Sequence, residues 1–182
     1  EQGIEVTSLP GAAACITALT LSGLPTRRFS FEAFLPKEKK ERAAVLEELK
    51  NDTRTLIVYE APHHLLGTLK ELQNALGDRR LTVCRELTKK FETAFQTTFS
   101  EAIRYYEEQG VRGECVLVIE GRSREELVQE AQQSWEAISV EEHMEHYLST
   151  GMDRKSAMKQ VAKDRGVGKR EIYQMLLNAE NE

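Results

Sequence analysis

Three short segments of this sequence combine small, aromatic and charged residues directly after an apolar run. They cover residues 8–14, 59–64 and 85–89, and the runs before them have the composition of β-strands. Open α/β sheets bind their ligands beside the carboxyl ends of strands, where loops vary on a rigid support. We therefore expect the three segments to border one crevice that binds a small molecule.

The first segment consists mainly of small residues. Pro10, Gly11, Ala13 and Ala14 stand where a strand over residues 4–9 would pass into a helix over residues 12–21. Small side chains let a ligand approach the backbone, and the amides at a helix start can donate to a carboxylate or another polar group. A turn that only packs strand and helix closely is the alternative.

Two adjacent histidines, His63 and His64, end the second segment. Neighbouring side chains on a helix point about 100° apart. No set of carboxylates or thiols beside them completes a coordination shell, so the sequence predicts no metal site.

Composition limits the class of protein. The 182 residues carry a net charge of −5 and are 40% hydrophobic, which is enough for a core, and no apolar run approaches the ~20 residues of a membrane-spanning helix. Cys15, Cys84 and Cys115 each lie in an apolar pattern, which predicts free buried thiols in a reducing cytoplasm. The negative charge does not indicate a nucleic-acid partner, so any basic surface must be local.

The apolar runs predict an α/β fold with a mixed sheet flanked by helices. Strands are expected over residues 4–9, 29–34, 55–59, 81–84, 91–99 and 115–120, with 91–99 pairing as a hairpin arm with 81–84. This domain should cover residues 1–121. Residues 122–139 are charged and rich in Gln, which predicts a linker or a solvated helix, and residues 140–182 predict a small all-helical tail.

The tail has the pattern of a helix-turn-helix. Helices are expected over residues 141–148, 154–164 and 169–177, with a glycine-containing turn at 165–168. Its basic residues are Lys155, Lys159, Lys163, Arg165, Lys169 and Arg170. We predict that Lys155, Lys159, Lys163, Lys169 and Arg170 contact a nucleic-acid backbone. A bundle whose basic face is merely solvated is the alternative.

Six motifs follow one another at residues 9–11, 23–26, 28–36, 54–60, 85–89 and 113–114. In this order they resemble the carboxy-terminal half of the ribosomal RNA small subunit methyltransferase I family, which belongs to the tetrapyrrole-methylase superfamily. The resemblance covers about residues 3–121. The resemblance implies 2′-O-methylation of a cytidine ribose in 16S ribosomal RNA, with S-adenosylmethionine as cofactor. It also implies the small ribosomal subunit as substrate and a homodimer of the intact enzyme. The cytoplasmic location is expected from the cysteines, and the lack of membrane attachment from the lack of a long apolar run.

The resemblance also assigns a cofactor site. The residues that it implies are Pro10, Gly11, Ala13, Ala14, Tyr59, Glu60 and Leu87, with Leu87 in the loop that lines the adenine. Family members begin with another α/β domain that bears a Gly-Asn-Leu-type loop and a Ser-Asp-Ala-Gly-Thr-Pro-type loop, and neither occurs here. We therefore expect a carboxy-terminal portion that holds one wall of the cleft and is inactive alone.

No catalytic residue can be assigned from the sequence. Methyl transfer from a sulfonium depends largely on alignment of the acceptor oxygen with the methyl group. By their position, Glu60, Glu86 and Lys89 are candidates for the base, although Glu86 can equally pair with a neighbouring cation.

A second basic cluster lies at the start of a predicted polar helix. It could extend a basic rim toward RNA and consists of Lys37, Lys39, Lys40 and Arg42.

Two other functions remain open. One is an RNA-binding module without catalysis, in which the tail makes the contacts. The other is a methyltransferase that acts on a small tetrapyrrole-like molecule.

Overall fold

The computed structural model describes residues 10–179, and the chain divides into two compact units, residues 1–122 and 123–182. The expected strand over residues 4–9 lies outside the described residues. The first unit contains β1 (Phe29–Phe34), β2 (Thr55–Glu60), β3 (Arg80–Arg85), β4 (Thr93–Thr98) and β5 (Cys115–Ile119). Its helices are α1 (Ala14–Leu21), α2 (Lys39–Leu49), α3 (Leu65–Leu76) and α4 (Phe99–Gln109).

The five described strands form one mixed sheet in the order β1-β2-β5-β3-β4. β1 pairs parallel with β2, while β5 runs antiparallel to both β2 and β3. β4 pairs antiparallel with β3, which confirms the predicted hairpin. The mixed α/β class is therefore confirmed.

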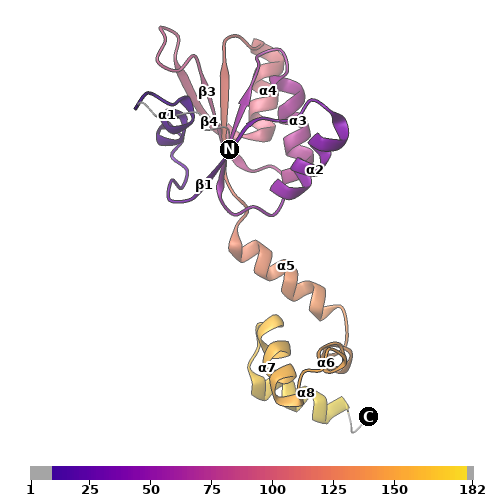
Figure 1. Cartoon of the computed structure of the whole chain (residues 1–182). Helices are drawn as coiled ribbons and strands as arrows, with labels where there is room; N and C mark the ends of the chain where they lie inside the picture. Colours follow the sequence, from indigo (N-terminus) through magenta and orange to yellow (C-terminus); the bar gives the residue numbers. More distant parts are fainter. Residues whose placement is uncertain (1–9, 180–182) are drawn as a thin grey trace, which may run out of the picture. The chain divides into compact units, whose positions relative to one another are not determined.

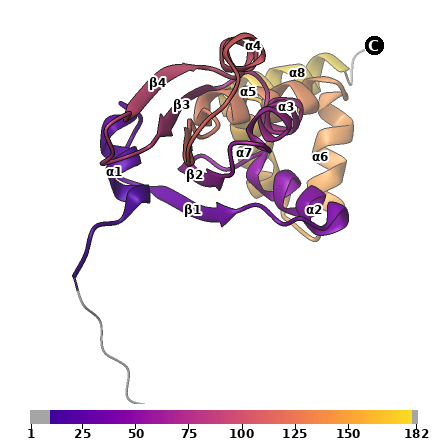
Figure 2. The same ribbon diagram turned by 90° about the horizontal axis from the view of Figure 1, so that it is seen from above.

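Helices cover the two faces of the sheet unequally. α2, α3 and α4 lie on one face, and α1 lies on the other (Figures 1 and 2). Leu56, Leu69 and Leu117 belong to the core under α3 and α4, whereas Ala18 and Ile57 belong to the smaller core under α1. Side chains of a strand alternate between faces, so each central strand contributes to both cores.

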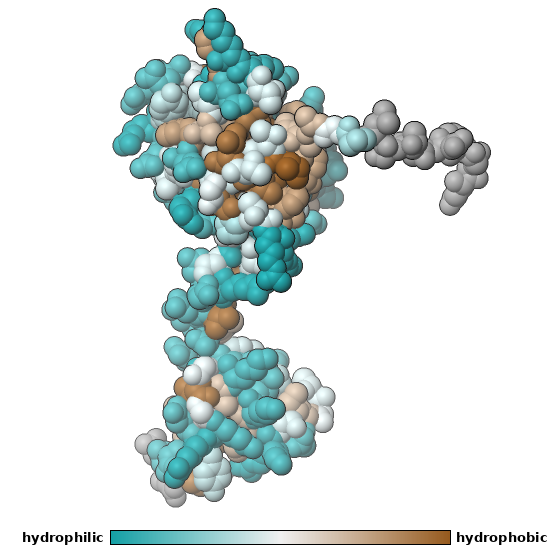
Figure 3. Space-filling model, turned by 90° about the vertical axis from the view of Figure 1, so that its left-hand side faces the viewer, coloured by the Kyte–Doolittle hydropathy of each residue, from teal (hydrophilic) through white to brown (hydrophobic). Residues whose placement is uncertain are grey.

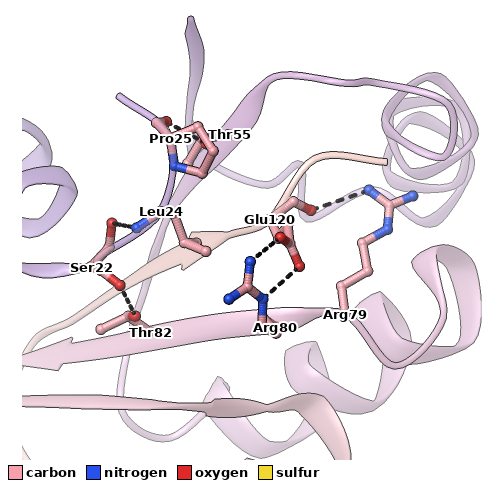
Figure 4. A network of polar contacts seen from close by, with 8 residues as sticks. All are labelled: Ser22, Leu24, Pro25, Thr55, Arg79, Arg80, Thr82 and Glu120. Carbon is pink, nitrogen blue, oxygen red and sulfur yellow. Dashed lines mark hydrogen bonds and ion pairs between the residues drawn. The ribbon is translucent and has the colours of Figure 1, made fainter. Parts of the chain in front are cut away.

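The chain after α1 is tied to the sheet by hydrogen bonds from threonines (Figure 4). The Thr82 hydroxyl donates to the carbonyl of Ser22 at 3.0 Å, and the Thr55 hydroxyl donates to the carbonyl of Pro25 at 2.7 Å. The Leu24 amide donates to the Ser22 hydroxyl at 3.1 Å. These bonds satisfy backbone groups in the turn and fix where α1 ends.

The second unit is helical. It contains α5 (Arg124–Glu136), α6 (Val140–Ser149), α7 (Arg154–Asp164) and α8 (Lys169–Ala179). Met144, Val161 and Ile172 are buried in a core that this unit forms by itself. The Trp135 ring of α5 stacks on the buried His143 ring of α6, with centroids 3.9 Å apart.

The two units divide the chain differently from the expected boundaries at 121 and 139. Residues 123–136, expected within a linker or solvated helix, belong to the helical unit, because the stacking of Trp135 joins α5 to α6. No helix among residues 10–179 is long and apolar enough to cross a membrane. Cys15, Cys84 and Cys115 are free thiols; Cys84 and Cys115 are buried, and Cys15 is half-buried.

Candidate functional site

The carboxyl ends of β1, β2 and β3 lie at the same end of the sheet, its carboxyl edge. β5 runs in the opposite direction, so its first residue reaches the same edge. The register places Glu60 of β2 and Arg85 of β3 on either side of Cys115 in β5. The second and third predicted segments therefore share this edge.

Tyr59 brings the start of α1 to the same edge. Its hydroxyl oxygen accepts a hydrogen bond from the Cys15 amide at 3.0 Å. Amides in the first turn of a helix have no partner within the helix, and the Ala13 side chain at the N-cap supplies none. Tyr59 takes over this capping role, and its burial, together with the neighbouring Cys15 thiol, raises the pKa of Tyr59.

The small residues before α1 are accessible. Pro10, Gly11, Ala13 and Ala14 are all exposed. A Cβ added at Gly11 would meet no atom within 4 Å. Among the described residues, nothing crowds position 11, and the backbone here can be approached by a ligand.

An irregularity in β1 places two phenylalanines on Tyr59. The register with β2 shifts between Phe31 and Ala33, and Ala33 has a positive φ of 53°. A bulge of this kind redirects the following side chain. The rings of Phe31 and Phe34 both meet Tyr59 edge to face, with centroids at 5.0 and 5.7 Å. This aromatic group was not predicted from the sequence, although three phenylalanines in one short strand were a visible signal.

Leu87 joins the same side of the sheet. It is half-buried and packs with Tyr59 and Cys15 against the core under α1. The structure therefore brings together three predicted parts of the site: the start of α1, Tyr59 and Leu87. Much of the surrounding surface is apolar, as Figure 3 shows for the side of the first unit that carries α1 and β1. Its exposed apolar side chains are Ile16, Leu21, Phe29, Phe31 and Phe34.

Glu60 points to the opposite face from Tyr59. Its side chain is 8% exposed and accepts hydrogen bonds from the Thr68 hydroxyl at 2.6 Å and the Ala61 amide at 2.8 Å. The Thr68 hydroxyl in turn accepts from Arg42 at 2.8 Å. The carboxylate of Glu60 therefore connects β2 with α3, and only its backbone belongs to the edge beside Tyr59.

The four basic residues that were expected to extend a rim toward RNA differ in whether they are free to contact a ligand. Arg42 is held by Glu71 at 2.6 Å, whereas Lys37, Lys39 and Lys40 are exposed. Arg42 therefore does not extend a basic rim with the three lysines, because its guanidinium joins α2 to α3.

His63 and His64 are exposed, with ring centroids 4.1 Å apart, just before α3. Among residues 10–179, no group of three or more His, Cys, Asp or Glu side chains is placed to hold a metal ion.

The predicted nucleic-acid residues lie on the outside of the helical unit. Lys155, Lys159, Lys163, Lys169 and Arg170 are all exposed. The three lysines of α7 are four residues apart, which puts them in one row along the helix, spaced by about 6 Å.

Arg165 differs from these five residues. It is half-buried, and its guanidinium donates to His143 at 3.2 Å and to the carbonyls of Ile138 and Ser139 at 2.7 and 2.9 Å. Counting Arg165 in the basic surface was wrong, because its donors bind the chain between α5 and α6.

Comparison with known proteins identifies the family. The model of the family Tetrapyrrole (Corrin/Porphyrin) Methylases matches residues 1–103. Among curated relatives, "Ribosomal RNA small subunit methyltransferase I" of Halalkalibacterium halodurans is 46% identical over 95% of this chain and 59% of its own length. The protein of the same name from Bacillus subtilis is 48% identical over 92% of this chain and 57% of its own length.

A solved structure supports the fold. The methyltransferase CobJ has a TM-score of 0.50 at 21% identity, over 64% of this chain and 52% of its own. The chain spans about three fifths of the length of the two curated relatives described above. On the match of its first 103 residues, the chain belongs to the Tetrapyrrole (Corrin/Porphyrin) Methylases.

Proposed function

We propose that this chain supplies one wall of the S-adenosylmethionine cleft of a methyltransferase that acts on ribosomal RNA. The observation that carries the proposal is the meeting of exposed small residues, Tyr59 and Leu87 at the carboxyl edge of the sheet. The family match and the names of the curated relatives support the same activity.

The residues at this edge suit the cofactor. Exposed backbone around Gly11 and Ala13 can face the polar part of a ligand, since no large side chain covers it. Tyr59 and Leu87 offer the apolar wall that a purine needs, with backbone groups nearby for its edge. Cofactor contacts are proposed at Pro10, Gly11, Ala13, Ala14, Tyr59, Glu60 and Leu87, with Glu60 contributing through its backbone.

The protein's part in the reaction is mainly positional. When bound, S-adenosylmethionine supplies a methyl group on a sulfonium, which is already activated for displacement. The wall of the cleft holds that group in one orientation and excludes water on the side of Tyr59. Because the Glu60 carboxylate is engaged by Thr68 and Ala61, we do not propose it as the base.

For the substrate we propose the ribose 2′-oxygen of a cytidine in 16S ribosomal RNA within the small subunit. The exposed basic residues of the helical unit, Lys155, Lys159, Lys163, Lys169 and Arg170, are proposed to contact phosphates. We further propose that the intact enzyme is a homodimer and works in the cytoplasm. The exposed apolar surface of Figure 3 is compatible with coverage by another part of such an assembly.

The lysine row on α7 favours a second candidate function. An RNA-binding module without catalysis would also use these residues, because the helical unit has a core of its own. The two functions differ in one respect, since only the methyltransferase requires affinity for S-adenosylmethionine.

The decisive experiment is methyl transfer from labelled S-adenosylmethionine to small ribosomal subunits that lack the modification. The chain alone is compared with the chain joined to the amino-terminal domain of the Bacillus subtilis relative. Labelling of a cytidine ribose by the joined protein supports the proposal. A folded joined protein that binds the subunit but transfers no methyl group refutes it in favour of the binding module.

A further inference from the structure

The loop after β3 contains two strained residues. Glu86 has a φ of 49° and Thr88 a φ of 64°, in a region that residues other than glycine rarely adopt. Thr88 is β-branched, which makes its conformation the less favourable of the two. Such conformations persist only where the surrounding structure enforces them, and they are frequent at functional sites.

Glu86 itself supplies much of this enforcement. Its backbone amide donates to the carbonyl of Glu114 at 3.1 Å, and its carboxylate accepts from the Glu114 amide at 2.8 Å. The same residue thus binds both backbone groups of Glu114, just before β5. Lys89 adds a third link, since its ammonium lies 3.5 Å from the Glu86 carboxylate and 3.0 Å from that of Glu114.

Gly113 provides the space that the Glu86 side chain occupies. A Cβ added at Gly113 would lie 2.5 Å from both Cγ and Cδ of Glu86, and still closer to its carboxylate oxygen. Gly113 also has a φ of 78°, so its backbone disfavours any larger residue. Glu86 therefore forms a clamp on Glu114, in which its carboxylate lies against the backbone just before β5, in the space that Gly113 leaves open.

The clamp fixes the residue between the two strained positions. Leu87 lies between Glu86 and Thr88 and packs against the core under α1, as Tyr59 and Cys15 also do. On the other side, the Thr88 amide donates to the Glu92 carboxylate at 2.6 Å. Both ends of this three-residue segment are thus held by carboxylates, and Leu87 has little freedom to turn away from the core under α1.

We propose that Glu86 is a positioning residue of the cofactor site, which holds Leu87 against the cleft through the clamp on Glu114. The inference rests on the proposed function, because it takes Leu87 as part of the S-adenosylmethionine site. Glu86 touches no reacting group in this scheme. Its effect should therefore appear in affinity for the cofactor and not in the chemical step.

The first test measures the clamp in this chain without any ligand. In Glu86→Ala, amide hydrogen exchange at Thr88, Lys89 and Glu114 should become at least about tenfold faster. Glu86→Gln keeps an acceptor for the Glu114 amide and should retain most of the protection. Unchanged exchange in Glu86→Ala would overturn the clamp.

The matched control is Glu120→Gln. Glu120 pairs with Arg80 at the opposite edge of the same sheet (Figure 4). This variant also removes a carboxylate at an end of β5, yet exchange at Thr88 and Glu114 should stay at the wild-type rate. Faster exchange there would show that the loop responds to any loss of sheet stability, which contradicts a specific clamp.

The second test measures cofactor binding in the joined protein described above. Glu86→Ala should raise the Kd and KM for S-adenosylmethionine by about tenfold with kcat within about twofold, and Glu86→Gln should restore most of the affinity. Leu87→Ala should also weaken binding. The loss of binding free energy in the double variant should be smaller than the sum of the losses in the two single variants, because Glu86 acts through Leu87.

The outcomes separate this inference from the function on which it rests. If the wild-type joined protein does not bind S-adenosylmethionine, the proposed function fails, and the exchange data alone decide whether the clamp exists. If the wild type binds and Glu86→Ala binds equally well, the positioning role is refuted while the proposed function stands. Full additivity of the two substitutions would refute the route through Leu87.

Discussion

The hydroxyl of Tyr59 accepts a hydrogen bond from the amide of Cys15, 44 positions earlier in the chain, at 3.0 Å. One side chain at the end of β2 thereby fixes the first turn of α1. The helix start and the strand end, which sequence patterns indicated separately, are one structural unit in the fold.

The first prediction follows from this bond. Tyr59→Phe leaves the Cys15 amide without its partner, so the free energy of unfolding should fall by about 1 kcal/mol. Native-state hydrogen exchange of amides in β2 and β5 measures the change. Tyr173→Phe, which alters an exposed tyrosine of the helical unit, should change the stability by less than about 0.5 kcal/mol.

A second prediction concerns Gly11. Because space is open around this residue, Gly11→Trp should leave the fold intact and obstruct the cofactor. Calorimetric binding of S-adenosylmethionine to the joined protein should weaken at least about tenfold, with an unchanged circular dichroism spectrum. Retained affinity in the folded variant would remove this turn from the site.

A third prediction concerns RNA. Replacing Lys155, Lys159 and Lys163 together with Gln should weaken binding to the small subunit and lower the salt slope of log K by about 2 to 3 units. The same triple change at Lys37, Lys39 and Lys40 tests the other exposed basic cluster. An unaltered slope in the first variant would reject phosphate contact by α7, and a loss confined to the second would assign it to α2.

A fourth prediction uses alkaline pH. Burial raises the pKa of Tyr106 to about 12. Because the folded protein favours the neutral phenol, this residue's contribution to stability is complete below about pH 10 and is lost as the pH rises toward 12. Urea denaturation of Tyr106→Phe should therefore show a flatter decline than the wild type over that range. The buried thiols of Cys84 and Cys115, each with a pKa raised to about 11, should still cause a decline from about pH 9 in both proteins.

A fifth prediction uses acid pH and Trp135, the single tryptophan of the sequence. Burial lowers the pKa of His143, the adjacent Arg165 and His146 act in the same direction, and Asp164 opposes them. The neutral imidazole is thus favoured by folding. The contribution of His143 to the free energy of unfolding is therefore complete above about pH 6.5, and it is lost as the pH falls through the lowered pKa of the folded protein.

The fluorescence of Trp135 should report the acid transition of the helical unit. His143→Phe retains an aromatic ring for stacking on Trp135. This variant should remove much of the pH dependence of the unfolding midpoint of the helical unit. His146→Gln, which changes an exposed histidine near the same tryptophan, should retain it. Identical pH profiles of His143→Phe and the wild type would contradict the role of His143.

Periodic patterns predicted most of the fold because they depend on local chemistry. The run at 55–59 is β-branched and apolar, and it forms a central strand that is buried on both faces. The end of the same strand was predicted less well. Tyr59 and Glu60 were grouped as neighbours, although alternation along a strand sends consecutive side chains to opposite faces.

Contacts between distant parts of the chain could not be read from the sequence. The bulge at Ala33, the clamp of Glu86 on Glu114 and the stacking of Trp135 on His143 each depend on how elements pack. The charge of a side chain was also insufficient to assign it to the basic surface. Arg165 was grouped with the exposed lysines, but its donors are used inside the helical unit.

The separate core of residues 123–182 has a consequence for protein engineering. The helical unit encloses its own apolar residues, and the helix that follows its internal turn at Ser139 has a complete capping box. A segment with these properties can be transplanted to an unrelated scaffold without redesign of its interior. The partition of such a graft between the free and ribosome-bound fractions of a lysate would test the proposed affinity of the helical unit apart from the first unit.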